Sequence, residues 1–112
     1  MILHKNMKNA KIMEEIFAYL LEKGYQKIDA SMEITEVETT FIVMVHTDSD
    51  TLVQTFKNDM FCCRDYELEE YGWELMGEST CVCELDTLGM LVDNYDIEYE
   101  NGICTITLHR KA

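Results

Sequence analysis

The chain has 112 residues, which is the size of one domain, and its 47% hydrophobic content is typical of globular proteins. We therefore expect residues 1–112 to form a single domain. The formal charge is −13, from 22 acidic against 9 basic residues, and it opposes direct binding to nucleic acid or to an anionic membrane. That charge suits plain solubility, or equally an acidic nucleic-acid mimic that inhibits a DNA- or RNA-binding protein.

The N-terminal residues and the cysteines bear on localisation. Met1-Ile2-Leu3 is followed at once by polar residues, without the apolar region of a signal peptide. The longest apolar run, Phe41 to Val45, is too short to span a bilayer. Five cysteines are an odd number, which favours reduced thiols. We expect a cytoplasmic protein.

The first predicted helix runs from about Asn9 to Lys23, and Gly24 provides its C-terminal stop. Apolar residues recur in it at the spacing of a buried helical stripe, namely Met13, Ile16, Phe17, Leu20 and Leu21.

Residues 27–47 predict a β-hairpin. In the first strand the apolar residues alternate with polar ones, and they are Ile28, Ala30, Met32 and Ile34. We expect Phe17 and Met32 to be buried and to face each other, with Glu33 on the opposite face. After a polar turn over residues 35–39, the strand Phe41 to Val45 has apolar residues on both of its faces. Such a strand is typically central and covered on both faces.

Three helices are predicted after this hairpin. Thr51 and Gln54 match a capping box at the start of a helix that ends near residues 61–64. A second helix is predicted from Asp65 to Met76, and the glutamates of its acidic run Glu67 to Glu70 are expected to point outward together with Glu74. Tyr71 and Trp73 within it are candidates for a protein-binding patch, with a core-capping role as the equal alternative for Trp73. A short helix follows over Leu88 to Val92.

The last hairpin has the strongest local signal. Tyr95, Ile97 and Tyr99 alternate with acidic residues, and Asn101-Gly102 is the dipeptide preferred in a two-residue hairpin turn. In its second strand Cys104, Ile106 and Leu108 share one face. The order of elements predicts an α+β fold, a two-layer sandwich. It has about four mainly antiparallel strands in two hairpins, with three to four helices on one face. The pattern does not determine the strand order.

Candidate chemistry is sparse. If the protein bound zinc, its candidate ligands would be the four thiols of Cys62, Cys63, Cys81 and Cys83. Adjacent and one-apart pairs are unlike the usual spacing of two to four residues. We therefore expect packed or exposed thiols and no metal. We identify no catalytic residues, because the three histidines are scattered and no nucleophile elbow, P-loop or dinucleotide-binding turn is present.

One family resemblance covers most of the chain. EEIFAYLLEKGY (Glu14 to Tyr25), a strand pair ending near Asp48, LGMLVD (Leu88 to Asp93) and the terminal hairpin together resemble the small histidine-kinase-like (GHKL) ATPase domain. The closest likeness is to the anti-sigma-factor serine kinases. The resemblance implies an ATPase-like fold with nucleotide held through Glu14, Glu15, Asp48 and Gly89.

The family's chemical motifs are altered in this chain. Ala18 or Tyr19 stands where the magnesium-binding asparagine falls, and no glycine follows Asp48. Gly89 alone stands for the glycines of the lid. These departures imply that nucleotide binding is lost.

The leading hypothesis is therefore a non-enzymatic regulatory or protein-interaction domain, a degenerate relative of those ATPases. It would act on another protein, without cofactor, nucleic acid or membrane. The alternatives are a nucleotide-binding ATPase or kinase domain and the acidic mimic. The sequence indicates neither the oligomeric state nor the pathway.

Overall fold

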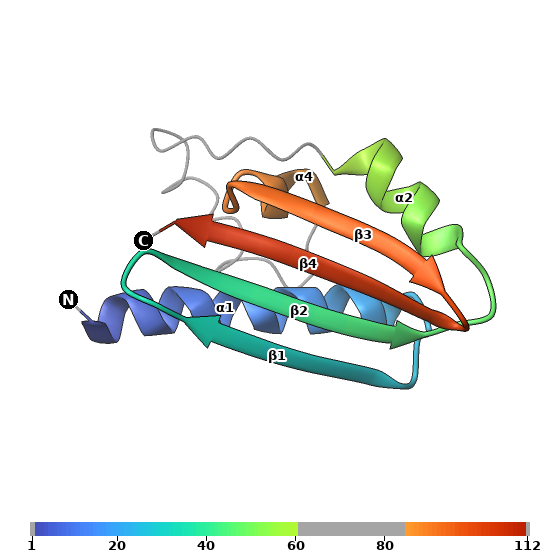
Figure 1. The fold of residues 1–112 in the computed structure, drawn as a ribbon, viewed down its shortest axis with the longest axis horizontal. Coiled ribbons are helices and arrows are strands. Elements are labelled where there is room, and N and C mark those ends of the chain that lie inside the picture. Colours follow the sequence, from blue (N-terminus) through green and yellow to red (C-terminus); the bar gives the residue numbers. More distant parts are fainter. Residues whose placement is uncertain (1, 61–84, 112) are drawn as a thin grey trace.

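The computed structural model describes residues 2–60 and 85–111, and they form an α+β fold (Figure 1). The elements are α1 (Ile2–Glu22), β1 (Ile28–Ile34), β2 (Glu38–His46), α2 (Thr51–Asp59), α4 (Leu85–Gly89), β3 (Asn94–Glu100) and β4 (Ile103–Lys111). The helix predicted from Asp65 to Met76 lies outside the described residues.

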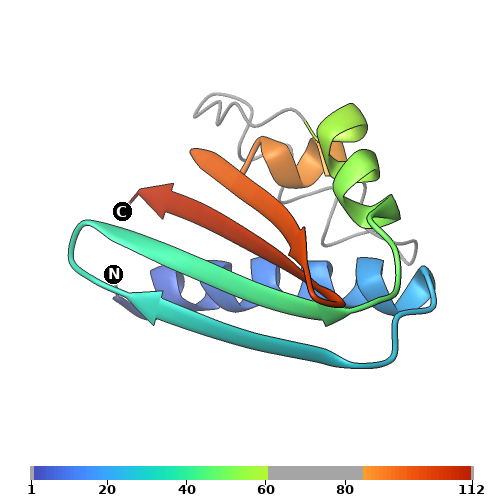
Figure 2. The same ribbon diagram turned by 45° about the vertical axis from the view of Figure 1, so that its right-hand side comes forward.

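The four strands form one antiparallel sheet in the order β1-β2-β4-β3. The two predicted hairpins therefore adjoin through β2 and β4, with Val43 opposite Ile106. This places β2 and β4 in the centre and leaves β1 and β3 as the edges. Figures 1 and 2 show α1 running along the sheet and α2 and α4 gathered beside β3.

Both hairpin turns follow from their residues. Asn101 and Gly102 have φ angles of 52° and 77°, the left-handed values that a two-residue turn of this type needs. This confirms the final predicted hairpin. In the first hairpin, the Thr35 hydroxyl accepts hydrogen bonds from the Val37 and Glu38 amides and closes the turn. β2 accordingly starts at Glu38, earlier than predicted.

The buried side of α1 differs from the predicted stripe by one residue. Among the described side chains of α1, the buried ones are Asn9, Ile12, Glu15, Ile16, Tyr19 and Leu20. Ile16 and Leu20 are therefore buried as predicted, whereas the other three predicted positions are not fully buried. One residue is about 100° of rotation, so Phe17 is only half-buried and Leu21 is 59% exposed. The expectation that Phe17 is buried against Met32 was wrong, although Met32 does contact the core from β1. The helix also begins earlier, at Ile2.

β2 is covered on one face only, which corrects the prediction for Phe41 to Val45. Phe41, Val43 and Val45 are fully buried, whereas Ile42 and Met44 on the other face are each 37% exposed. The prediction of which residues of β1 face the core is confirmed, because Met32 pairs with Phe41 on the helix side of the sheet. Its burial is incomplete because β1 is an edge strand.

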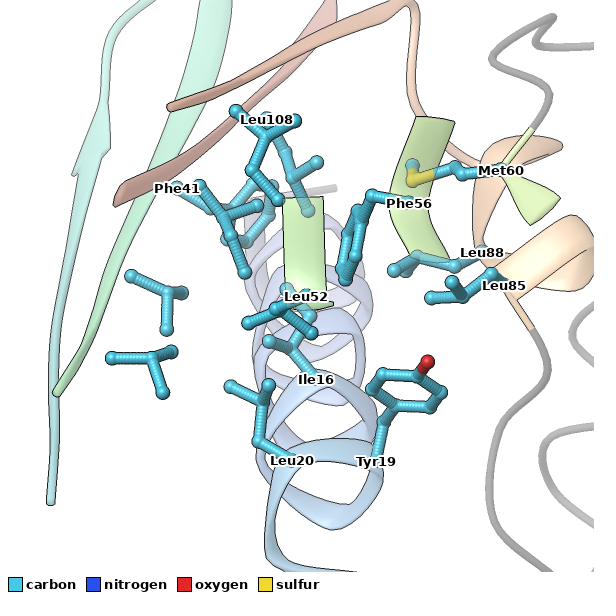
Figure 3. Close-up of a cluster of buried hydrophobic side chains, with 14 of the residues drawn as sticks. Ile16, Tyr19, Leu20, Phe41, Leu52, Phe56, Met60, Leu85, Leu88 and Leu108 are labelled. Atoms are coloured by element: carbon cyan, nitrogen blue, oxygen red, sulfur yellow. The ribbon is translucent and has the colours of Figure 1, made fainter. Parts of the chain in front are cut away.

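α2 and α4 complete the core at the β3 side. Asp50 and not Thr51 is the N-cap residue of α2, and its side chain makes no capping hydrogen bond. α4 is one turn that begins at Leu85, before the predicted start. The Phe56 ring lies 6.1 Å from that of Tyr19 (Figure 3). It also lies 6.4 Å from the ring of Tyr95, so Phe56 of α2 joins α1 to β3.

Polar residues are also buried at the end of the core near the start of β2. The Asn9 amide donates a hydrogen bond of 3.0 Å to the Thr39 hydroxyl, and both residues are buried. Arg110, next to Thr39 across β2 and β4, donates to the Leu91 carbonyl at 2.6 Å. These bonds offset the cost of burying polar groups and join α1 and residue 91 to the sheet.

Replacing Phe41 by alanine should lower the free energy of unfolding by about 3–5 kcal/mol, because the ring is fully buried. Phe17→Ala should cost less than about 1.5 kcal/mol, since that ring is only partly buried and lies outside the buried core cluster. Glu33→Ala, on the exposed edge strand, should change the free energy by less than about 0.5 kcal/mol. Urea melts of the three variants measure these values, and an equal loss for Phe17→Ala and Phe41→Ala would contradict the packing of α1.

Candidate interaction surface

None of the described helices covers the face of the sheet opposite α1, and we call it the open face. Its centre is formed by alternate residues of β2 and β4, in which Ile42 lies opposite Thr107 and Met44 opposite Thr105. Ile42 and Met44 are the exposed large hydrophobic residues of this face. Threonine next to exposed isoleucine and methionine gives a flat surface that takes both apolar and hydrogen-bonding contacts.

Carboxylates border this apolar centre along both edge strands. Asp29 and Glu33 lie on β1, and Asp96, Glu98 and Glu100 lie on β3. All five are exposed and belong to the open face. The two acidic rows are separated by three strand spacings, roughly 14 Å. The basic residues at this parity, Lys27 and Lys111, lie at or beyond the strand ends. Between these rows the electrostatic potential is negative, which attracts a cationic partner.

Two histidines lie at opposite ends of the open face. His46 Nε2 is 3.2 Å from Asp29 Oδ2 across the β1–β2 pair. His109 Nδ1 is 3.5 Å from Thr40 Oγ1 and 4.0 Å from Glu38 Oε1. A nucleophile–histidine–acid relay needs the hydroxyl and the carboxylate at different ring nitrogens. Here both approach Nδ1, so the group does not have the geometry of that relay.

The residues proposed for nucleotide binding lie on separate elements. Glu14 and Glu15 share Lys11, at 3.7 Å and 3.0 Å, and the bond to Glu15 is the main cause that raises the pKa of Lys11. Asp48 is exposed after β2, and Gly89 is buried at the end of α4. No hydrogen bond or ion pair within residues 2–60 and 85–111 connects the glutamates, Asp48 and Gly89. Tyr19, one of the two residues expected at the asparagine position, is buried against Phe56.

The four candidate zinc ligands, Cys62, Cys63, Cys81 and Cys83, lie outside the described residues, as do Glu67 to Glu70, Tyr71 and Trp73. In the part of the chain that the structure describes, no three His, Cys, Asp or Glu side chains are grouped so as to hold a metal. Cys104 is a buried free thiol on the core face, as predicted. Burial raises its pKa to about 11, so it is a packed, protonated side chain and not a nucleophile at neutral pH.

Sequence reasoning missed the open face. The apolar run from Phe41 to Val45 suggested a strand covered on both sides, which hid the exposure of Ile42 and Met44. The signal that would have indicated it is in β4. There the polar residues Thr105, Thr107 and His109 lie on the same face of the sheet as Ile42 and Met44 of β2. A polar face on one central strand indicates that its neighbour also faces water there.

The comparisons with known proteins add no functional assignment. No protein-family model matches the chain, and neither curated proteins nor solved structures yield a match. The function must therefore be inferred from this chain's own surface chemistry. Among the helices described, none has the length and apolar character required to cross a membrane.

The cysteine expectation gives a direct test. The purified protein should carry no stoichiometric zinc, and a chelator should leave its melting temperature unchanged. A structural zinc site contributes on the order of 10 kcal/mol to folding, so its removal would produce an unmistakable fall in melting temperature. Elemental analysis and melts with and without chelator provide the measurement.

Proposed function

We propose that this chain is a cytoplasmic, non-enzymatic regulatory domain whose open face binds another protein. The observation that carries the proposal is the arrangement of exposed Ile42 and Met44 between two rows of carboxylates. Apolar contact at the centre supplies affinity, and the acidic border selects a partner with basic residues around an apolar patch. The odd number of cysteines and the free thiol of Cys104 support a reducing compartment.

The size of the face limits how the partner is bound. β2 has nine residues, so a sheet of four strands offers roughly 500–600 Å². A standard interface buries about 800 Å² on each partner. An interface of standard size would therefore extend beyond the flat face, and an adjoining edge strand is the nearest additional surface.

A degenerate relationship to the histidine-kinase-like ATPases is compatible with this proposal. In that case the fold would be retained and the nucleotide chemistry lost. The packing of Tyr19 in the core and the ion pair of Glu15 with Lys11 support the loss of nucleotide chemistry in particular. The ATPase or kinase alternative would instead require Glu14, Glu15, Asp48 and Gly89 to act together.

The acidic mimic is a second candidate, favoured by the two parallel rows of carboxylates on the edge strands. It would place these rows in the basic groove of a DNA- or RNA-binding protein and displace the nucleic acid. Such binding would weaken steeply with salt, whereas contact with Ile42 and Met44 would depend on salt only weakly.

ATP with magnesium should not bind detectably when titrated calorimetrically at about millimolar concentration. A dissociation constant of about 1 mM corresponds to only about −4 kcal/mol, so even weak sites fall within reach of this test. ADP and a magnesium-only titration are the controls. Micromolar affinity would restore the ATPase or kinase alternative and displace the non-enzymatic proposal.

The protein, tagged and expressed in the cells that make it, should capture a basic protein that is lost with the double change Ile42→Ser and Met44→Ser. The matched control is Met7→Ser with Val37→Ser, which changes exposed apolar residues on α1 and in the turn between β1 and β2 and leaves the open face and Leu21 intact. Quantitative mass spectrometry of the three samples measures the loss. A captured protein that is lost equally from both double variants, or from neither, would contradict the use of the open face.

Adding the captured protein's own nucleic acid distinguishes the two candidates. Competition for one site, with a steep salt dependence, would support the mimic. Simultaneous binding would support an interaction domain that leaves the partner's nucleic-acid site free.

A further inference from the structure

Two backbone hydrogen bonds show which residues of the edge strand β1 direct their amides and carbonyls toward β2. The Thr35 amide donates to the Glu38 carbonyl, and the His46 amide donates to the Lys27 carbonyl. In an antiparallel pair, bonded and non-bonded positions alternate. Asp29, Ser31 and Glu33 therefore direct their amides and carbonyls toward β2, and the residues between them direct theirs outward from the sheet.

This outward row consists of the backbone groups of Ile28, Ala30, Met32 and Ile34. In residues 2–60 and 85–111, these groups have no hydrogen-bond partner across the edge. The other edge is different, because α2 lies beside β3 and the Phe56 carbonyl accepts a bond from the Tyr95 hydroxyl. An unprotected edge strand is a template for another strand, and β1 contains no proline or bulge that would prevent pairing.

The helix side of this edge is apolar and incompletely covered. Tyr19 points toward Phe56 and the β3 side of the core (Figure 3). Phe17 and Leu21 are each two residues from Tyr19, which places them about 160° around the helix, on the β1 side. Phe17 is half-buried and Leu21 exposed, and Ile34 on β1 is 46% exposed. A strand placed beside β1 would cover these side chains with its own apolar residues.

The opposite side of the same edge is acidic, because Asp29 and Glu33 project onto the open face. A strand has side chains alternately on its two sides, so a strand added to β1 would meet apolar groups with one set and carboxylates with the other. We infer that an extended segment of a basic partner, with Lys or Arg alternating with apolar residues, adds to β1 as a fifth strand. The inference rests on the proposed function and supplies the additional contact area that the open face lacks.

A second copy of the chain fits this edge less well. Each copy has a formal charge of −13, so association is opposed over the whole molecule. In the two-fold register centred on Ser31, Asp29 of one β1 would lie directly opposite Glu33 of the other. Like charges opposite each other across strands are destabilising.

The probe is a soluble peptide, matched in length to β1, in which lysine alternates with valine, and its control has glutamate in place of lysine. Amide hydrogen exchange of the free protein should be slow at Ser31 and Glu33 and fast at Ala30 and Met32. The lysine peptide should slow exchange at Ala30 and Met32 at least about tenfold, and the glutamate peptide should not. Rapid exchange at both residues with the lysine peptide bound would overturn strand addition.

Ala30→Pro tests the same contact by mutation, because it removes an outward amide that β2 does not use. It should weaken binding of the lysine peptide at least about tenfold, while Ala30→Thr, which keeps the amide, should bind like the unchanged protein. Thermal melts report whether each variant folds. If Ala30→Pro does not fold, the charge reversal Asp29→Lys with Glu33→Lys serves instead, and unchanged affinity in it would count against a basic partner.

The outcomes separate this inference from the proposed function. Peptide binding that perturbs Ile42 and Met44 without protecting Ala30 and Met32 overturns strand addition and leaves the open face as the binding site. No binding at about millimolar peptide also overturns strand addition, and the captured-partner experiment then judges the open face alone. Protection of Ala30 and Met32 that rises with protein concentration, together with dimers in ultracentrifugation, would assign the edge to a second copy.

Discussion

The rest of the structure depends on the pairing of β2 with β4 over a core that covers one face only. Phe41, Val43 and Val45 lie opposite Leu108, Ile106 and Cys104, and all six side chains are fully buried. The described helices pack on this side of the sheet, and none of them covers the opposite face, where Ile42 and Met44 are exposed. Because each hairpin contributes one central strand, its other strand must be an edge, and the exposed surface of the molecule follows from that topology.

The same arrangement explains where the charges lie. Edge strands tolerate carboxylates because water reaches these side chains there. The central strands have threonine, isoleucine and methionine on the open face. The result is a surface with an apolar middle and an acidic border, next to the β1 edge, whose outward backbone groups have no partner among the described residues. Each feature alone is common in soluble domains. Their combination on adjoining surfaces favours recognition of an extended, cationic and partly apolar segment.

Much of the fold could be predicted because its signals are local. The period of two in β1 and β3 and the Asn101-Gly102 turn each depend on residues close in the chain, and each is found in the structure. The buried side of α1 was misjudged because its apolar stripe is wider than the surface that the core covers. Met13, Phe17 and Leu21 belong to the stripe but lie at its incompletely buried side. Hydrophobicity alone does not distinguish a side chain under the sheet from one beside its edge.

The sequence by itself determined the strands, the turns and the strong negative charge, because backbone preference, side-chain alternation and ionisation are properties of neighbouring residues. Only the tertiary structure decided that β2 pairs with β4, that Ile42 and Met44 face outward, and that Thr40 and Glu38 approach the same nitrogen of His109. These features depend on which strands become neighbours. That choice comes from the packing of segments far apart in the chain, over a sheet that the described helices cover on one side.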